Sequence, residues 1–252
     1  MKFDVKFSES NQSFKPQFGE VHNISDGGYE RGYAKGYEVG YTDGVATAEV
    51  DSARFASELK FNNWSLFGGE TGEVTIYNQT SLSNTFAISR DTPNQTVKHL
   101  TVNCDTQPTN MFGAFRAMND SDTTLNRLTL NFDTSKCSDF GYCFRGLRRL
   151  EVIDGTPLDF SSINPSEVNA INYAFYVCNS LKDIRFKPNT IPSSISFGNS
   201  GDLTNDSVWS IINGLMDYTG GESKTVTFAG SIKQKLGSAE KEAIASKNWV
   251  LG

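Results

Sequence analysis

Three arginines in the C-terminal half of the chain are spaced so that they could form one binding surface. Arg127, Arg149 and Arg185 stand between the apolar positions of three similar hexapeptides, LNRLTL, LRRLEV and LKDIRF. If each hexapeptide is a strand of one parallel sheet, these side chains face outward and form a ladder across three adjacent strands. Guanidinium groups pair with phosphate and carboxylate in bidentate fashion, which suits an anionic surface glycopolymer. The alternative is that the arginines pair with Glu151 and Asp183 and only solubilise the face.

The same outward positions supply the full set of candidate ligand-binding residues. They are His99, Arg127, Arg149, Glu151, Arg185 and Lys187. The sequence holds only two histidines, His22 and His99, and neither has the Ser/Asp or Cys/Asn neighbours of a nucleophilic site. Phosphate-binding loops, HExxH and EF-hand loops do not occur in the sequence. We therefore expect a binding protein without enzymatic activity, cofactor or metal.

The composition of the chain limits the classes of molecule that it could bind. The chain of 252 residues has a net charge of −6 and a sequence pI near 5.0, which argues against general binding to nucleic acid. Continuous apolar stretches of membrane-spanning length and a secretory h-region are missing from the sequence, so neither membrane insertion nor ordinary export is expected. Four cysteines without CxxC spacing are expected to be buried free thiols.

An internal repeat must position the candidate residues. The pattern apolar-x-x-apolar-x-apolar recurs in VKHLTV, LNRLTL, LRRLEV and LKDIRF, with central positions Leu100, Leu128, Leu150 and Ile184. EVTIY and TVTFA fit as partial units before and after these four. Repeats of this length with an LxxLxL core predict a leucine-rich-repeat solenoid over residues 61–252, in which each repeat adds one strand to a parallel sheet.

Aromatic anchors accompany the repeat, and helices end it. MFGAF, FGYCF and INYAF precede three of the strands and are expected to pack behind the sheet. A C-terminal cap is predicted over residues 203–252. Its first helix starts at an N-cap, Thr204 or Asn205, and ends near Gly220, and its second starts with Ser238 as the cap. Such helices would close the open end of the stack.

Two further segments precede the repeat domain. Residues 1–27 alternate apolar and polar side chains, which predicts a short extended segment. Because so short a segment buries little alone, it needs a partner surface: a second copy, another protein, or the C-terminal domain. Residues 28–60 are predicted to form a helical stalk. Its glycine and tyrosine rows favour self-association over the alternative of a flexible tether. The oligomerisation candidates are Gly28, Tyr29, Gly32, Tyr33, Gly36, Tyr37, Gly40 and Tyr41.

These segments resemble a known family. INYAFYVCNSLKDIRF resembles the BspA-like class of leucine-rich repeats, whose unit carries an Ala-Phe, a Cys and the LxxLxL strand; Ala174, Phe175, Cys178, Leu181 and Ile184 match it. The closing segment is similar to the C-terminal cap of such proteins in phages and prophages of Gram-positive bacteria. The opening MKFDVKFSESNQSFKPQFGEV with its Gly-Tyr repeats is similar to leaders from the structural-gene regions of those phages.

The resemblance implies a virion protein, tail-fibre or baseplate-associated, that presents the repeat face to a host receptor, either a surface glycan or a protein. The N-terminal segment would attach to other virion proteins, and the Gly-Tyr segment would form a homo-oligomer, with a trimer favoured. Two alternatives stay open. One is a purely structural decoration or head-fibre protein, and the other is a bacterial adhesin or cytoplasmic partner-binding protein.

Overall fold

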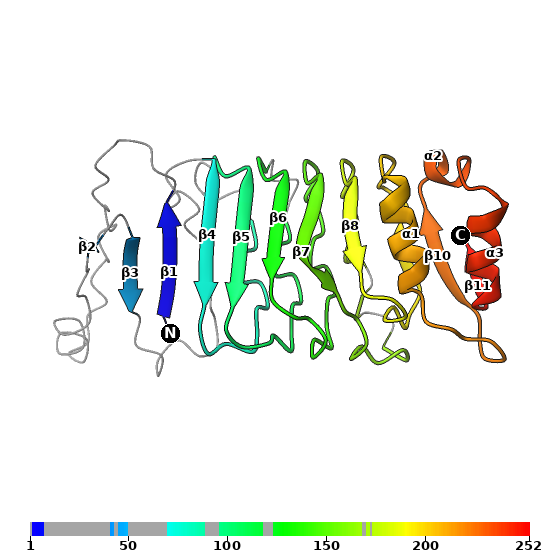
Figure 1. Ribbon diagram of the computed structural model, residues 1–252, viewed down its shortest axis with the longest axis horizontal. Coiled ribbons are helices and arrows are strands. Elements are labelled where there is room, and N and C mark those ends of the chain that lie inside the picture. The colour runs from blue at the N-terminus through cyan, green and yellow to red at the C-terminus, as the bar shows by residue number, and fades with distance from the viewer. Residues whose placement is uncertain are drawn as a thin grey trace, which may run out of the picture.

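Five parallel strands form the main sheet of this α/β protein. The computed structural model describes residues 70–88, 96–117, 123–167, 170–171 and 173–252, and the strand backbones of residues 2–7, 41–42 and 45–49. The parallel strands are β4 (Thr71–Ile76), β5 (His99–Cys104), β6 (Arg127–Asn131), β7 (Val152–Leu158) and β8 (Asp183–Phe186). They stand side by side in chain order (Figure 1).

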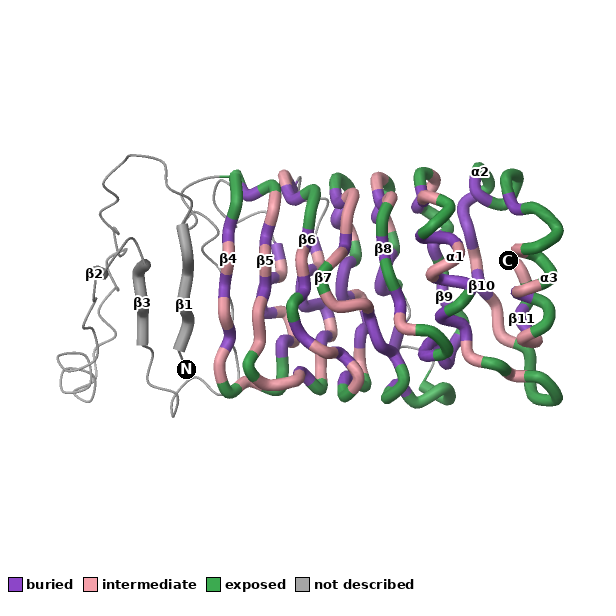
Figure 2. Tube along the Cα trace, viewed as in Figure 1, coloured by how far each residue is buried: buried purple, intermediate pink, exposed green. Residues whose placement is uncertain are grey.

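Alternation of apolar and polar residues explains the strands. In β5 and β6 the side chains of Leu100, Val102, Leu128 and Leu130 are buried, while the residues between them are exposed or half-buried. The same alternation of buried and open positions runs across the sheet (Figure 2). One face therefore belongs to the core and the other remains open, as the hexapeptide pattern predicts.

The turns behind the sheet form a second hydrogen-bonded stack. Backbone bridges join Ser81 to Asn110 and Asn110 to Asp139, so successive turns lie parallel to each other. The anchor segments fall in these turns. Their phenylalanines stack in a buried column of Phe86, Phe115, Phe144, Phe175, Phe197 and Phe228. The predicted packing of the anchors is confirmed.

The register of β7 differs from the sequence alignment. Leu128 lies opposite Ile153, and Ile153 lies opposite Ile184, so the central position of the third unit is Ile153 rather than Leu150. The unit LRRLEV was placed three residues too early because the Leu-x-x-apolar spacing occurs twice in succession, and Leu147 and Leu150 are both buried. β7 also bulges between Ile153 and Leu158.

The N-terminal strands join the same sheet. β1 (Lys2–Phe7) pairs antiparallel with β4 on one side and with β3 (Val45–Glu49) on the other. The extended structure predicted for the leader is confirmed over these six residues, and their partner surface is the edge of the parallel sheet. β1 thereby covers an edge that would otherwise present unpaired backbone groups.

The helix predicted over 28–60 is wrong where the backbone is described. Residues 41–42 form β2 (Tyr41–Thr42) and residues 45–49 form β3. The three-residue spacing of Val45 and Ala48 suits a helix, because residues an odd number apart lie on opposite faces of a strand. Pairing with β1 nevertheless satisfies the backbone of β3 as a strand. The glycines and tyrosines from Gly28 to Gly40 lie outside the described residues, so the stalk there stays a prediction.

The C-terminal end changes from strand to helix. α1 (Asn205–Gly214) follows Thr204, whose hydroxyl accepts from the Ser207 N–H, confirming the predicted N-cap; the helix ends at Gly214, earlier than predicted. β9 (Ile195–Phe197), which precedes α1, forms a three-stranded parallel sheet with β10 (Lys224–Phe228) and β11 (Trp249–Leu251), which follow it. α2 (Gly230–Lys233) and α3 (Ser238–Ser246) complete the chain, and Gly237 rather than Ser238 is the N-cap of α3.

α1 covers the last edge of the main sheet. The Ser207 hydroxyl accepts the Ile184 N–H at 3.0 Å, and the Ser210 hydroxyl accepts the Phe186 N–H at 2.9 Å. These serines replace the next strand as hydrogen-bond acceptors. The helices among the described residues are too short or too polar to cross a membrane.

Candidate functional site

The open face of the main sheet carries most of the predicted site residues. His99 lies in β5, Arg127 in β6 and Arg185 in β8, each at an exposed or half-buried position. Glu151 lies immediately before β7, and Lys187 immediately after β8. Arg149 lies in a turn before β7 and makes contacts of its own.

The predicted arginine ladder is not formed. In the observed register Arg127 lies opposite Val152, and Val152 lies opposite Asp183. Arg185 stands two residues after Asp183 in β8, and Arg149 is outside the strands. The shift of three residues in LRRLEV removes Arg149 from the row. Arg185 stands at the fifth position of its hexapeptide, whereas Arg127 stands at the third, so these two are not aligned either.

A connected polar network replaces the ladder. Thr129 Oγ1 donates to Asp154 Oδ1 at 2.6 Å, and Arg127 forms an ion pair with the other oxygen of Asp154. His99 Nε2 lies 2.9 Å from Thr129 Oγ1. Since the threonine proton is directed to Asp154, His99 Nε2 is the donor in this contact. Three strands are thus linked through their outward side chains.

Burial sets the charge of the histidine. Desolvation lowers the pKa of His99, the positive charge of Arg127 lowers it further, and Asp154 raises it. The imidazole is therefore neutral near pH 7, with Nε2 protonated and Nδ1 able to accept a hydrogen bond.

A second outward row stabilises the first two strand pairs of the sheet. Asn103 Nδ2 donates to Glu73 Oε1 at 3.0 Å, and Asn131 Nδ2 donates to Asn103 Oδ1 at 3.0 Å. The amides of neighbouring strands satisfy each other across the open face. Their hydrogen-bonding capacity is largely used within the protein.

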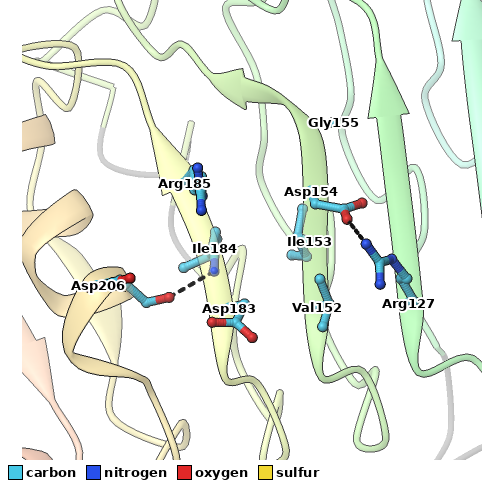
Figure 3. Close-up of a pocket in the computed structure, with 10 residues that line it drawn as sticks. Arg127, Val152, Ile153, Asp154, Gly155, Asp183, Ile184, Arg185 and Asp206 are labelled. Atoms are coloured by element: carbon cyan, nitrogen blue, oxygen red, sulfur yellow. Dashed lines mark hydrogen bonds and ion pairs between the residues drawn. The ribbon is translucent and has the colours of Figure 1, made fainter.

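A shallow pocket of about 360 Å³ lies on the open face between β6, β7, β8 and the start of α1. Its floor is formed by Val152, Ile153 and Ile184, and charged side chains stand around it (Figure 3). The charged lining residues are Arg127, Asp154, Asp183, Arg185 and Asp206.

Two of these charges have no partner among the residues that the structure describes. Arg127 is paired with Asp154, and Asp183 Oδ1 accepts from Thr204 Oγ1 at 2.9 Å. The side chains of Arg185 and Asp206 make no hydrogen bond or ion pair with any residue that the structure describes. The pocket can therefore offer one guanidinium and one carboxylate to a polar ligand.

Asp154 and Asp206 were missed by sequence reasoning. Asp154 fell outside the aligned unit, although the observed register places it opposite Thr129 of β6. Asp206 lies in the first turn of α1, after the N-cap that the sequence predicts. A helix that takes the place of the next strand lies with its first turn beside the last strand of the sheet. The helix start predicted after the last repeat strand was therefore the signal that could have indicated Asp206.

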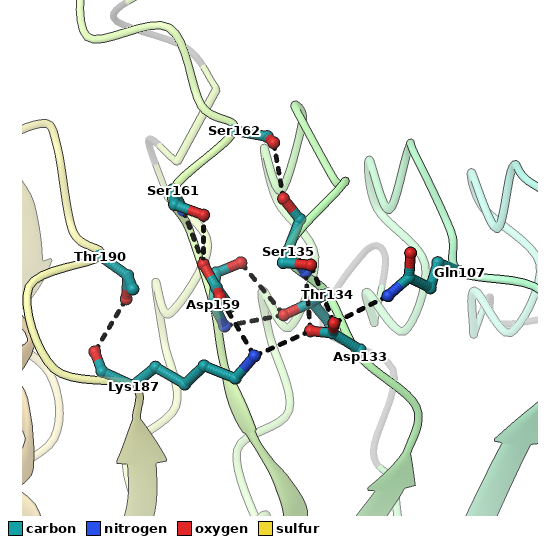
Figure 4. Close-up of polar contacts among 9 residues, drawn as sticks. All are labelled: Gln107, Asp133, Thr134, Ser135, Asp159, Ser161, Ser162, Lys187 and Thr190. Atoms are coloured by element: carbon teal, nitrogen blue, oxygen red, sulfur yellow. Dashed lines mark hydrogen bonds and ion pairs between the residues drawn. The ribbon is translucent and has the colours of Figure 1, made fainter.

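Lys187 belongs to a separate cluster at the carboxyl ends of the strands. Its Nζ lies 3.1 Å from Asp133 Oδ1 and 3.2 Å from Asp159 Oδ2. Asp133 also accepts from Ser135 and Gln107, and Asp159 accepts from Ser161 (Figure 4).

The pKa values in this cluster follow from its contacts. Hydrogen bonds from Ser135 and Lys187 outweigh burial and lower the pKa of Asp133. The hydrogen bond to Asp133 is the largest cause of the raised pKa of Lys187. Lys187 is therefore committed to joining three successive turns, so its role in this structure is to stabilise the turns.

Glu151 is also engaged. Its Oε2 lies 3.0 Å from Lys182 Nζ, and the two side chains are 45% and 43% exposed. Lys98 and Glu70 form the matching ion pair at the start of β5 and β4. Such exposed pairs add little stability. They neutralise charge at the amino ends of the strands.

The cysteines offer no reactive site among the described residues. All four thiols are free, with Cys137, Cys143 and Cys178 buried and Cys104 partly exposed. Burial raises the pKa of Cys104, Cys137 and Cys178 to about 12, so their reactive thiolate forms are scarce at neutral pH. In the described part of the chain no group of three His, Cys, Asp or Glu side chains is arranged to hold a metal.

Comparisons with known proteins add nothing to this geometry. No protein family, no curated protein and no solved structure matches the chain. The functional argument therefore depends on the sheet, its open face and the pocket.

Proposed function

We propose that the protein is a non-enzymatic phage structural protein, tail-fibre or baseplate-associated, that binds a host receptor through the open face of its sheet. The observation that carries this proposal is the pocket beside α1, where Arg185 and Asp206 make no hydrogen bond or ion pair with the described residues. A receptor with both anionic and hydrogen-bonding groups, such as a surface glycopolymer, would use the guanidinium and the carboxylate together.

The fold that we propose for this role is a leucine-rich-repeat solenoid. In-register parallel strands with central residues Leu100, Leu128, Ile153 and Ile184 support it, because these positions recur about once per turn of chain. The buried phenylalanine column behind the sheet is a second support. A stack of this kind presents an extended face on rigid strands, which is what repeat proteins use for recognition.

Adsorption to host cells tests the binding role. The full-length variant Arg185→Gln removes the free guanidinium, and we expect the cell-bound fraction of the purified protein to fall at least tenfold. Lys235→Gln is the matched control, because Lys235 is an exposed cation just after α2 and does not line the pocket. Equal adsorption of the Arg185 variant and the wild type would favour the decoration or head-fibre alternative.

Mass in solution tests the proposed homo-oligomer. Removing residues 1–60 would uncover the edge of β4, so a milder change is preferable. We propose replacing Tyr29, Tyr33 and Tyr37 by Ser and measuring mass by light scattering. A trimer that becomes a monomer supports the stalk. A monomeric wild type would leave the Gly-Tyr segment as a tether.

A further inference from the structure

A row of aromatic rings lies on the turns behind the strands. It consists of Phe112, Tyr142, Tyr173 and Tyr176, with Arg116 and Arg145 beside them, and we call it the aromatic–arginine row. The Phe112–Tyr142, Tyr142–Tyr173 and Tyr173–Tyr176 ring centroids are each 5.5 Å apart. Tyr173 is 47% exposed and Tyr176 is 44% exposed, which makes them two of the three exposed large hydrophobic residues in the described part of the chain.

Two of these tyrosines occupy strained backbone positions. Tyr142 has φ 57° and Tyr173 has φ 55°, in the left-handed region that disfavours side chains with a Cβ. The equivalent positions of the two preceding turns are Asn84, with φ 55°, and Gly113, with φ 59°. The equivalence follows from the turn stack: the Asn84 N–H donates to Phe112 O, and the Gly113 N–H donates to Gly141 O.

The backbone strain at Tyr142 and Tyr173 would be smaller with asparagine or glycine at these positions, so the backbone conformation does not explain why tyrosine is present. Asparagine and glycine adopt this conformation at low cost, as Asn84 and Gly113 show. Tyr142 is half-buried and Tyr173 is exposed, so the free energy gained by burying these rings is limited. Strain kept at exposed positions is a reason to look for a binding role.

The two arginines of the row have no anionic partner in the described part of the chain. Arg145 lies over the Tyr142 ring at 5.2 Å and over the Tyr176 ring at 5.6 Å, and Arg116 lies over Phe112 at 5.9 Å. Neither guanidinium forms an ion pair with the residues that the structure describes. Burial and the neighbouring positive charge of Arg145 lower the pKa of Arg116. Two cations without a described counter-charge therefore stand together on an acidic protein.

The geometry of the row limits the class of ligand. Tyr142 and Tyr173 are stacked at 17°, so each covers a face of the other, and neither hydroxyl makes a hydrogen bond with a described residue. Hydroxyls and guanidinium groups supply hydrogen-bond donors, which suits a ligand rich in oxygen acceptors and negative charge. Phe112, Tyr142 and Tyr173 come from three successive turns and form a file, with Tyr176 beside Tyr173. A file of rings fits a linear chain rather than the broad area of a stable protein interface.

We infer that the aromatic–arginine row binds an anionic polysaccharide chain that carries carboxylate or phosphate groups. The chain lies along the file of rings, its sugars contact the tyrosine edges, and its anionic groups pair with Arg116 and Arg145. This surface is on the turns and is separate from the pocket beside α1. It does not depend on the phage role proposed above.

Glycine substitutions give a sharp test. In the full-length double variant Tyr142→Gly and Tyr173→Gly, the backbone strain is relieved, so the thermal midpoint is expected to stay equal or to rise. Binding to polygalacturonate, a carboxylate polymer, and to poly(glycerol phosphate) is measured by affinity electrophoresis. We expect the double variant to lose at least tenfold in affinity for whichever polymer the wild type binds, and this identifies the anionic group.

Three controls separate this proposal from nonspecific attraction. Arg145→Gln is expected to weaken binding at least fivefold, whereas Lys235→Gln, which removes the same charge elsewhere, leaves it within twofold. Uncharged dextran and polyglutamate serve as comparison polymers. Equal affinity for either of them, no binding of both anionic polysaccharides, or unchanged affinity in the glycine variant would overturn the inference. Arg185→Gln leaves this binding intact, so a failure of the sheet-face proposal is recognised separately.

Discussion

His99 shows how one residue ties the open face together and becomes a source of pH dependence. It donates to Thr129, which holds Asp154 and through it Arg127. Its lowered pKa means that the unfolded chain, with a histidine pKa near 6.5, binds a proton more readily than the folded protein. Stability contributed in this way is full above pH 6.5 and decreases as the pH falls below it.

We predict that the wild-type protein loses more stability between pH 7 and pH 5 than the variant His99→Gln does. Glutamine keeps a donor for Thr129 but has no proton to gain. Urea unfolding at both pH values measures the difference. The carboxylate Asp133, whose pKa is lowered, loses its contribution only at more acidic pH and does not disturb this comparison. Identical pH dependence in the two proteins would contradict the role assigned to His99.

At the scale of single elements, β7 contains a glycine whose replacement by any other residue is expected to lower the stability of the fold. Gly155 has φ +88°, and a Cβ there would lie 2.4 Å from Leu130 O of the neighbouring strand. Gly155→Ala should therefore lower the free energy of unfolding by about 3 kcal/mol, through backbone strain and through the clash with β6.

Gly220 provides the control for this substitution. It has φ +82°, but nothing lies within 4 Å of its Cβ position. Gly220→Ala carries the strain without the clash, and we expect a loss of about 1 kcal/mol. Urea unfolding of both variants measures the two values. Equal losses of unfolding free energy in the two variants would show that a Cβ at Gly155 does not clash with β6.

The junction between β8 and α1 gives a second prediction at this scale. Ser207 is buried and accepts the Ile184 N–H at 3.0 Å. Ser207→Ala leaves this N–H without an acceptor, which should lower the free energy of unfolding by about 1–3 kcal/mol. Ser246→Ala removes an exposed hydroxyl of α3 and should change it by less than about 0.5 kcal/mol. A loss at Ser207 no larger than that at Ser246 would mean that α1 does not cap the sheet.

The elements also show what the sequence could and could not reveal. The buried positions Leu100 and Leu128 and the anchors in the turns follow from apolar periodicity, which the chain displays directly. The register of β7 does not follow, because Leu147, Leu150 and Ile153 are equally good core residues and only the pairing of β7 with β6 and β8 distinguishes them. The pocket was missed for the same reason.

Elements that depend on distant pairing were also beyond sequence reasoning. β3 has a pattern compatible with helix or strand, and the edge of β1 determines the outcome. β9 is only three residues long and exists as a partner of β10. Tertiary hydrogen bonds select these structures over local preference.

At the scale of the whole molecule, the phenylalanine column connects the main sheet to the C-terminal end. Phe144 is fully buried, with its ring 5.9 Å from Phe115 and 5.4 Å from Phe175. The column continues through Phe197 to Phe228 of β10. In a stack whose units contact mainly their neighbours, the loss of one central ring weakens the coupling between the two parts as well as the local packing.

We therefore predict that Phe144→Ala lowers the free energy of unfolding by about 3–5 kcal/mol and separates unfolding into two transitions. With Trp64 replaced by Phe, fluorescence reports on Trp209 and Trp249, both in the C-terminal part, while circular dichroism reports on the whole chain. The two signals should coincide in the Trp64→Phe background and in Phe144→Leu, which keeps most of the volume, and diverge in Phe144→Ala. Coincident transitions in Phe144→Ala would contradict this role of the column. The hydrogen bonds between the turns and from α1 to β8 would then couple the main sheet to the C-terminal part without it.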